Sequence, residues 1–281
     1  MRRRRQPLAP SGREPQIRWR IVNARRPFRK KHKDQPMSQK PKVVKCSDCP
    51  IRKLDTFRKF ESSELSFVSG FKTGELRADA GASILVEGSH SAHLFTLLSG
   101  WAFRYKTLED GRRQILNFAL PGDLLGLQGS VEGEMQHSVE ALTPVTLCVF
   151  ERQRLREIFT RHPELAFDVT WIASREERIL DEHLLSVGRR TALERAAYLL
   201  AFLHQRAIAS GVAPNRRLPV NQQHVADTLG LSTVHTNKTL RKLANRDMIR
   251  WHDSSCEILD GNGLLKVANW DGIDNKKRPF I

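Results

Sequence analysis

The strongest constraint on this chain is the stretch of residues 218–249, LPVNQQHVADTLGLSTVHTNKTLRKLANRDMI, whose pattern predicts a helix, a tight turn and a second helix. Asn221 and Ser232 are the expected N-caps, because their side-chain oxygens can accept a hydrogen bond from a free backbone N–H. Gly230 stands where the first helix has to end in a left-handed conformation. This pattern is typical of a helix-turn-helix, whose second helix enters the major groove of DNA. A helical hairpin with another role would use the same glycine, so the rest of the chain has to decide.

The second predicted helix has two faces of different chemistry. Thr236, Leu240 and Leu243 fall on an inward face at helical spacing. The opposite face carries the residues that we expect at the DNA, namely Thr233, Val234, His235, Asn237, Lys238 and Arg241. Among these, Asn237 is suited to adenine and Lys238 to the N7 and O6 atoms of guanine. A phosphate contact, which positions the protein without reading sequence, is expected for Arg241.

The net charge of +16 favours a polyanionic partner, but most of it lies at one end of the chain. The first 36 residues hold thirteen Lys or Arg against two acidic residues, which accounts for +11. We expect residues 1–45 to be a disordered basic tail, because they show no apolar periodicity. Three interpretations compete: a nucleic-acid-binding arm, a targeting peptide, or residues upstream of a true start at Met37. We favour the last of these.

Neither a membrane location nor a disulfide framework is predicted. No stretch approaches the ~20 apolar residues that a membrane helix needs. The four cysteines, Cys46, Cys49, Cys148 and Cys256, are too few and too scattered for a disulfide scaffold. A reducing cytoplasm is therefore the expected location.

The remaining patterns predict a chain of the α+β class. Short alternating segments separated by turns predict a β-roll sensor domain over 46–151, with a double-stranded β-helix or jelly-roll architecture. A largely helical region follows over 152–188, with a hinge expected at Gly188. Residues 189–270 are expected to form a winged helix-turn-helix domain, with wing strands near 249–252 and 256–260. The polar residues 271–281 are expected to be a loose tail.

The long helix that begins at Pro163 carries an apolar seam at three-four spacing. Its members are Leu165, Val169, Ile172, Ile179, His183 and Ser186. Such a seam packs against a partner element. In a symmetric DNA-binding protein that partner is the second subunit, whereas in the simpler alternative it is the chain's own roll.

The order of these parts resembles the CRP/FNR family of bacterial transcriptional regulators, and the resemblance extends over roughly residues 46–268. Three motifs carry it: Pro121-Gly122-Asp123-Leu-Leu-Gly126, then Ala192-Leu-Glu194-Arg195-Ala, then the helix-turn-helix from Val225 to Leu243. The resemblance implies a cyclic-nucleotide-binding-like roll, a dimerisation helix and a homodimer on a palindromic operator in double-stranded DNA. It also implies contact with RNA polymerase and no enzymatic activity.

The resemblance argues against a cyclic nucleotide as the signal. Family members that bind cyclic AMP carry a Glu shortly after the Pro-Gly-Asp run and an Arg just before a serine. Here Leu127 and Gln128 follow Gly126, and His137 precedes Ser138. A cyclic phosphate carries a full charge, and a bidentate Arg is its natural partner.

An iron–sulfur cluster is the other cofactor that the resemblance suggests, and oxygen or redox state is the corresponding signal. The oxygen-sensing branch of the family uses closely spaced N-terminal cysteines and one cysteine late in the roll. Cys46, Cys49 and Cys148 match these positions, and Asp55 is the candidate fourth ligand. Cys148 as a small buried hydrophobic residue is the simpler alternative, and a redox role of the thiols alone is a third.

Two functions of other classes remain open on the sequence. A cupin-type enzyme would hold a metal in the roll, where His90, His93 and His137 lie, but these show no tight His-x-His pattern with a carboxylate. A ligand-binding module could instead regulate a partner protein without contacting an operator.

Overall fold

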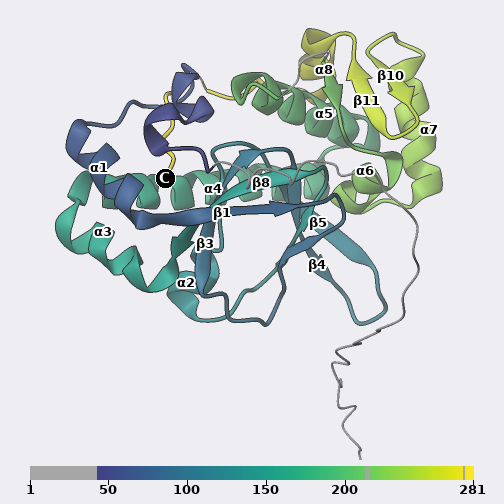
Figure 1. The fold of residues 1–281 in the computed structure, drawn as a ribbon. Coiled ribbons are helices and arrows are strands. Elements are labelled where there is room, and N and C mark those ends of the chain that lie inside the picture. Colours follow the sequence, from purple (N-terminus) through teal and green to yellow (C-terminus); the bar gives the residue numbers. More distant parts are fainter. Residues whose placement is uncertain (1–42, 213–215, 275) are drawn as a thin grey trace, which may run out of the picture. The chain divides into compact units, whose positions relative to one another are not determined.

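The computed structural model describes residues 43–212, 216–274 and 276–281. The basic tail expected over residues 1–45 lies almost wholly outside the described residues, so its three interpretations stay predictions. The described chain from Val43 to Ile281 is one compact unit. Figure 1 shows the roll strands together, with the C-terminal helices and the strands β10 and β11 forming a second group.

The first part is the predicted β-roll. Its strands are β1 Lys72–Ala78, β2 Ser83–Leu85, β3 His93–Ser99, β4 Ala102–Thr107, β5 Arg113–Ala119, β6 Leu124–Leu125, β7 Ser138–Ala141 and β8 Val145–Glu151. They form two four-stranded antiparallel sheets, ordered β1-β8-β3-β6 and β2-β7-β4-β5. The inner faces pack through side chains such as Leu97, Val139 and Leu147, none of which is measurably exposed. This packing of two sheets confirms the predicted fold class.

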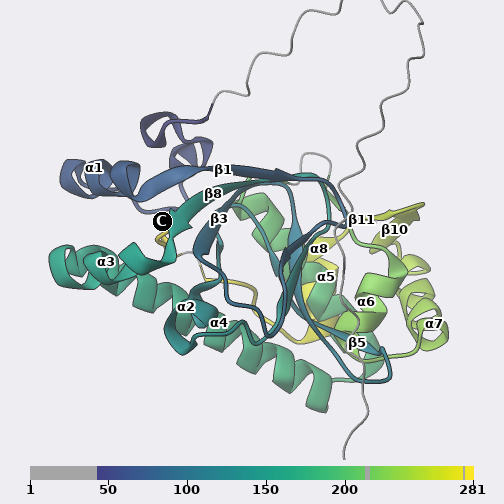
Figure 2. The same cartoon turned by 60° about the horizontal axis from the view of Figure 1, so that its bottom comes forward.

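Helices frame the roll on the N-terminal side and along its length. They are α1 Ser62–Phe71, α2 Leu127–Glu132, α3 Leu155–Arg161 and α4 Pro163–Arg189, with short 3₁₀ turns at Cys46–Asp48, Pro50–Lys53 and Arg152–Arg154. Figure 2 shows α4 running beside the roll from α3 toward the C-terminal helices. The helix continues through Gly188, so the hinge predicted there is wrong. The break falls at Arg190 and Thr191, because Thr191 and Glu194 form a capping box that starts the next helix.

The C-terminal part has the predicted winged helix-turn-helix arrangement. Its elements are α5 Ala192–Ala209, β9 Arg217–Leu218, α6 Gln222–Leu229, α7 Thr233–Ala244, β10 Ile249–His252, β11 Ser255–Ile258 and α8 Gly261–Ala268. The wing strands pair in the order β10-β11-β9. Residues 196–203 of α5 are buried on every side of the helix, as expected of a helix at the centre of a core.

The seam of α4 packs within its own chain. Leu165 and Val169 join the core with the N-terminal segment, and Ile179 joins the core with α5. Different side chains of α4 remain exposed, with Phe167 at 67%, Leu184 at 73% and Leu185 at 50%. The alternative of self-packing therefore holds for this seam, and a second subunit would meet another face of the helix.

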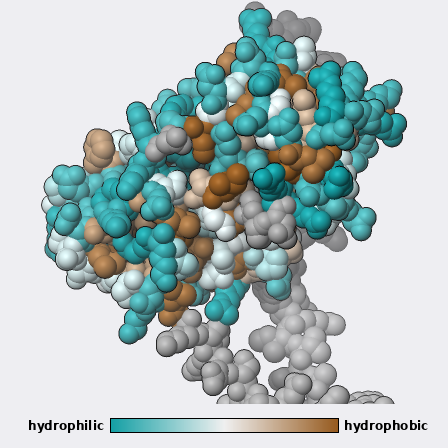
Figure 3. Space-filling model, turned by 90° about the horizontal axis from the view of Figure 1, so that it is seen from above, coloured by the Kyte–Doolittle hydropathy of each residue, from teal (hydrophilic) through white to brown (hydrophobic). Residues whose placement is uncertain are grey.

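The expectation of a loose C-terminal tail is wrong. Arg278, Phe280 and Ile281 are buried, and the C-terminus lies beside the N-terminal segment in both ribbon views (Figures 1 and 2). No helix among the described residues is long and apolar enough to cross a membrane. On the face shown in Figure 3, hydrophobic residues lie in small groups between hydrophilic ones.

Candidate functional site

The helix-turn-helix is built by three local contacts, all predicted from the sequence. Asn221 Oδ1 accepts a hydrogen bond of 2.8 Å from the backbone N–H of His224. Gly230 ends α6 with a φ of 65°, the left-handed conformation that a side chain would disfavour. Ser232 Oγ accepts from the backbone N–H of His235 at 3.2 Å. These caps fix where α7 begins and hence which of its residues face outward.

The two faces of α7 are separated as predicted. Thr236, Leu240 and Leu243 are almost completely buried. The exposed side chains are Thr233, Val234, His235, Lys238 and Arg241. Val234 is 67% exposed. The outward face of α7 is therefore open to a ligand as large as a DNA duplex.

Asn237 differs from the other predicted contact residues. It is half-buried, and its Oδ1 atom is buried without a hydrogen-bond partner among the described residues. Pairing with adenine uses both the oxygen and the nitrogen of the amide. Asn237 would therefore have to rotate its side chain to read a base in that way.

A groove of about 500 Å³ adjoins the start of α7. It is lined by Asn221, Gln222, Gln223, Thr233, Trp251, His252 and Asp253, which come from the starts of α6 and α7 and from the wing. Gln222, Gln223, Trp251 and His252 are not among the DNA contacts predicted from the sequence. Their positions could have indicated such a role, because polar residues at a helix start and at a wing tip lie where such domains meet the backbone of DNA.

A chain of polar contacts links α7 to the roll. Thr233 Oγ1 donates to Gln223 Oε1 at 3.0 Å, and Gln223 Nε2 donates to Asp227 Oδ1 at 2.6 Å. The other oxygen of Asp227 lies 2.8 Å from Arg113 Nη2 on β5. In addition, Gln114 Nε2 donates to the carbonyl of Thr228 at 2.9 Å. The contacts of Arg113 and Gln114 could not be predicted from the sequence, because each joins residues 114 positions apart.

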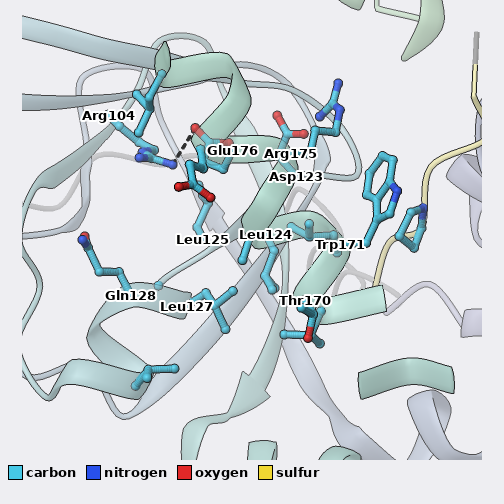
Figure 4. A pocket seen from close by; sticks show the side chains of 18 of the residues that line it. Arg104, Asp123, Leu124, Leu125, Leu127, Gln128, Thr170, Trp171, Arg175 and Glu176 are labelled. Carbon is cyan, nitrogen blue, oxygen red and sulfur yellow. Dashed lines mark ion pairs between the residues drawn. The ribbon is translucent and has the colours of Figure 1, made fainter. Parts of the chain in front are cut away.

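A second candidate site is a pocket of about 610 Å³ between the roll and α4. Its lining includes Arg104, Leu127, Gln128 and His137 from the roll side, and Trp171, Arg175 and Glu176 from α4. In Figure 4, a dashed line marks the ion pair between Arg104 and Glu176, whose Nη1 and Oε1 atoms are 2.8 Å apart. The charge of Arg104 is thus already paired.

This pocket lacks the two groups that a cyclic nucleotide would need at the family positions. Leu127 stands at the ribose position and carries no acceptor. Burial, together with the nearby Arg104, lowers the pKa of His137 to about 4, so its imidazole is neutral at pH 7. Its Nδ1 atom is hydrogen-bonded to Gln128 at 3.0 Å. A neutral imidazole is a poor partner for a phosphate.

Cys46, Cys49 and Cys148 come together in one hydrophobic cluster with the N-terminal segment and α3. Cys49 and Cys148 are buried, and Cys46 is half-buried. Burial raises the pKa of Cys49, and it raises the pKa of Cys148 to about 11. Lys72 lies in the same region, and its ammonium forms an ion pair with the carboxylate of Glu75 at 2.7 Å. Cys256 belongs to the other core, beneath the wing.

The predicted metal ligands do not fit an iron–sulfur cluster in this structure. Among residues 43–212, 216–274 and 276–281, no three His, Cys, Asp or Glu side chains are grouped so that they could hold a metal ion. Asp55, the candidate fourth ligand, is exposed. Of the histidines considered for a cupin site, His90 and His93 are exposed and His137 is buried. The thiols therefore remain candidates for redox chemistry of their own.

Two family models match the chain. Residues 75–162 match a cyclic nucleotide-binding domain, and residues 194–267 match a Crp-like helix-turn-helix domain. The second match contains the whole of α6, the turn and α7.

Similar proteins carry related names. The chain is 31% identical over 216 residues to the nitrogen fixation regulation protein FixK of Bradyrhizobium diazoefficiens, covering 76% of this chain and 90% of the relative. It is 28% identical over 210 residues to the transcriptional activator protein FnrL of Cereibacter sphaeroides, covering 73% and 84%. The solved structure of FixK2 from Bradyrhizobium japonicum superposes with a TM-score of 0.61 at 24% identity, covering 71% of this chain and 98% of that one.

Proposed function

This chain belongs to the CRP/FNR family of DNA-binding transcriptional regulators, and we propose that it acts in the cytoplasm as a homodimer on a pseudo-palindromic operator. The outward face of α7, held open by the Gly230 turn, is the observation that carries this proposal. Each subunit would place α7 in the major groove of one half-site, with the half-sites about one helical turn, roughly 34 Å, apart. RNA polymerase is the expected protein partner at such a promoter.

The operator should differ from the one that the family's best-known members read. Those members carry an acidic residue and an Arg at the positions of Val234 and Lys238. Val234 offers only apolar contact, which suits the methyl group of thymine, and Lys238 suits guanine. Arg241, which has no ion pair among the described residues, is free to hold a phosphate.

The dimer is expected to form through the exposed apolar face of α4. At least half of the side chain is exposed for Phe167, near the start of α4, and for Leu184 and Leu185, near its end. Contact with a second subunit would remove this apolar surface from water. A second α4 packed there would bury them and would set the distance between the two copies of α7.

The signal is proposed to act at the N-terminal half, with the three clustered thiols as its receptor. Cys46 is the most accessible of them, so an oxidant would reach it first. Oxidation of Cys46 would change the packing of the 46–60 segment against the roll. The proposal requires no metal.

Selection of binding sites from a random duplex library tests the function. The wild-type protein should enrich a two-fold symmetric sequence, and Lys238→Ala should weaken binding to it by about ten- to a hundred-fold. Lys59→Ala is the matched control, because Lys59 is an exposed lysine on the N-terminal segment. Enrichment of no symmetric sequence, or equal binding by the two variants, would contradict the proposal.

A further inference from the structure

The last residues of the chain connect the DNA-binding half to the N-terminal half. After α8, residues 271–274 pass α5, where Gln205 Oε1 accepts a hydrogen bond of 2.8 Å from the backbone N–H of Ile273. Asp274 then pairs with Arg178 of α4 at 2.8 Å. The chain ends beside the N-terminal segment and not beside α8 (Figures 1 and 2). The segment is therefore a second connection between the two halves besides the one at Arg190: it continues the chain from α8 and is held at the N-terminal half by non-covalent contacts.

The end of this segment occupies a built receptor. The ring of Phe280 stacks on Phe60 with centroids 5.4 Å apart and meets Phe57 edge-on at 5.0 Å. The guanidinium of Arg52 lies 5.2 Å from the centre of the same ring. Both Phe280 and Ile281 are only 4% exposed. Burial of an aromatic side chain on this scale contributes substantially to binding.

Backbone contacts add direction to this docking. The N–H of Arg278 donates to the carbonyl of Thr56 at 2.9 Å, and the N–H of Arg58 donates to the carbonyl of Arg278 at 2.9 Å. The carbonyl of Ile281 accepts from the hydroxyl of Thr96 inside the roll. Because these bonds use backbone groups in register, the segment has one seated position and cannot slide along the receptor.

A single carboxylate in the roll joins the segment to α5. Asp123, in the Pro-Gly-Asp turn, receives Arg278 at 2.6 Å on one oxygen and Arg206 of α5 on the other. Burial opposes the charge of Asp123, but the two guanidinium groups hold its pKa well below the usual range. Arg278 also donates to the carbonyl of Pro121 at 2.7 Å. The roll turn thus holds two cations that both belong to the DNA-binding half.

We propose that residues 271–274 and 276–281 are an intramolecular clasp, whose receptor is the surface formed by Arg52, Phe57, Phe60 and Asp123. With its end seated, the clasp fixes the orientation of α7 relative to the roll. Since two copies of α7 have to match two half-sites at once, a fixed orientation raises the fraction of binding-competent dimers. Three residues of the receptor, Arg52, Phe57 and Phe60, follow soon after Cys46 and Cys49 in the chain. A change in that segment therefore reaches the DNA-binding half through the clasp.

The test compares Phe280→Ala and Arg278→Gln with Lys277→Ala in the full chain. Lys277 is exposed in the same segment, so its variant removes a positive charge without touching the receptor. Phe280→Ala and Arg278→Gln should each bind the selected operator about ten-fold more weakly, while Lys277→Ala stays within about two-fold of the wild type in the same assay. All three should bind a random-sequence duplex like the wild type. Unchanged or tighter operator binding by Phe280→Ala would overturn the clasp.

Hydrogen exchange without DNA provides an independent measurement on the same variants. Loss of the clasp should speed exchange at the amide of Arg58, whose acceptor is Arg278, and in helix α6, while the sheets of the roll stay protected. Protection of α6 unchanged in Phe280→Ala would overturn the clasp. Only the DNA-binding result of this inference rests on the proposed operator binding. A wild-type protein that binds no palindrome would contradict the proposed function, and the hydrogen-exchange result would then test the clasp by itself.

Discussion

The guanidinium of Arg113 on β5 lies 2.8 Å from the carboxylate of Asp227 on α6, which fastens the roll directly to the first helix of the helix-turn-helix. Arg113 is 26% and Asp227 11% exposed at the side chain. Asp227 in turn receives Gln223, which holds Thr233 at the start of α7. The orientation of α7 is therefore coupled to strand β5 of the roll.

A double-mutant cycle on Arg113→Ala and Asp227→Ala should reveal this coupling. Because both side chains are largely shielded from water, we expect an interaction free energy of about 1–2 kcal/mol in urea unfolding. The exposed pair of Arg112 and Asp110, at 77% and 53% exposure, is the matched control and should show no measurable coupling. Additive effects at Arg113 and Asp227 would show that the contact does not stabilise the docked domain.

The elements that could be predicted are those set by local rules. Asn221, Gly230 and Ser232 each act within one turn of helix, so residue type alone predicted where α6 begins and ends and where α7 begins. The strands β6 and β9, of two residues each, were not predicted. They exist only because a partner strand pairs with them, and a short segment carries no periodicity of its own.

The candidate sites depended more on distant contacts. The polar pattern of residues 271–281 predicted a loose tail. Nothing in that pattern shows that Arg278 pairs with Asp123 or that Phe280 packs against Phe57. The resemblance to a family suggested Cys46, Cys49 and Cys148 as ligands, and the three residues lie in one hydrophobic cluster. Their spacing in the sequence could not show whether four ligands meet. Ligand geometry is a property of the packed structure.

Acidification should weaken the fold through His137. Burial lowers its folded-state pKa to about 4, against about 6.5 in an unfolded chain. Between these values the unfolded state binds the extra proton, so stability falls as pH drops through this window and is constant below it. From pH 7.5 to pH 5, His137 should account for about 2 kcal/mol of lost stability.

The variant His137→Gln separates this titration from packing. At pH 7.5 the imidazole is neutral in both states, so any stability difference there reports packing alone. The wild type should lose more stability than His137→Gln on going to pH 5, as measured by guanidinium unfolding at the two pH values. Equal losses would show that His137 is protonated as readily in the folded protein as in the unfolded chain.

The thiols should react in the order of their exposure. Only Cys46 is half-exposed, whereas burial raises the pKa of Cys148 to about 11 and of Cys256 to about 12. Since the thiolate is the reactive form, iodoacetamide at pH 7.5 should modify Cys46 first. The three buried thiols, those of Cys49, Cys148 and Cys256, should react only after unfolding in guanidinium, as measured by mass spectrometry of peptides. Labelling of Cys148 in the folded protein at the rate of Cys46 would refute the buried placement.

Replacing Arg241 and replacing Lys238 should change the salt dependence and the sequence preference of DNA binding in different ways. A phosphate contact releases counterions and reads no sequence, so Arg241→Ala should weaken binding to operator and random duplex alike. It should also reduce the slope of log K against log salt concentration by about one. In contrast, Lys238→Ala should mainly lower the ratio of operator to random-duplex affinity. If Arg241→Ala lowers that ratio as much as Lys238→Ala does, then Arg241 reads a base.

Replacing Gly188 and replacing Gly230 by alanine should change the stability of the protein in opposite directions. Gly188 lies inside α4, and a Cβ there would meet no atom within 4 Å. Gly188→Ala should therefore stabilise the protein by about 0.5 kcal/mol, because alanine favours helix. Gly230 has a φ of 65°, so Gly230→Ala should cost about 1–2 kcal/mol. If Gly188 were the hinge, Gly188→Ala would instead weaken operator binding. A hinge at Arg190 and Thr191 predicts unchanged operator affinity for Gly188→Ala, because the helical backbone at residue 188 needs no glycine.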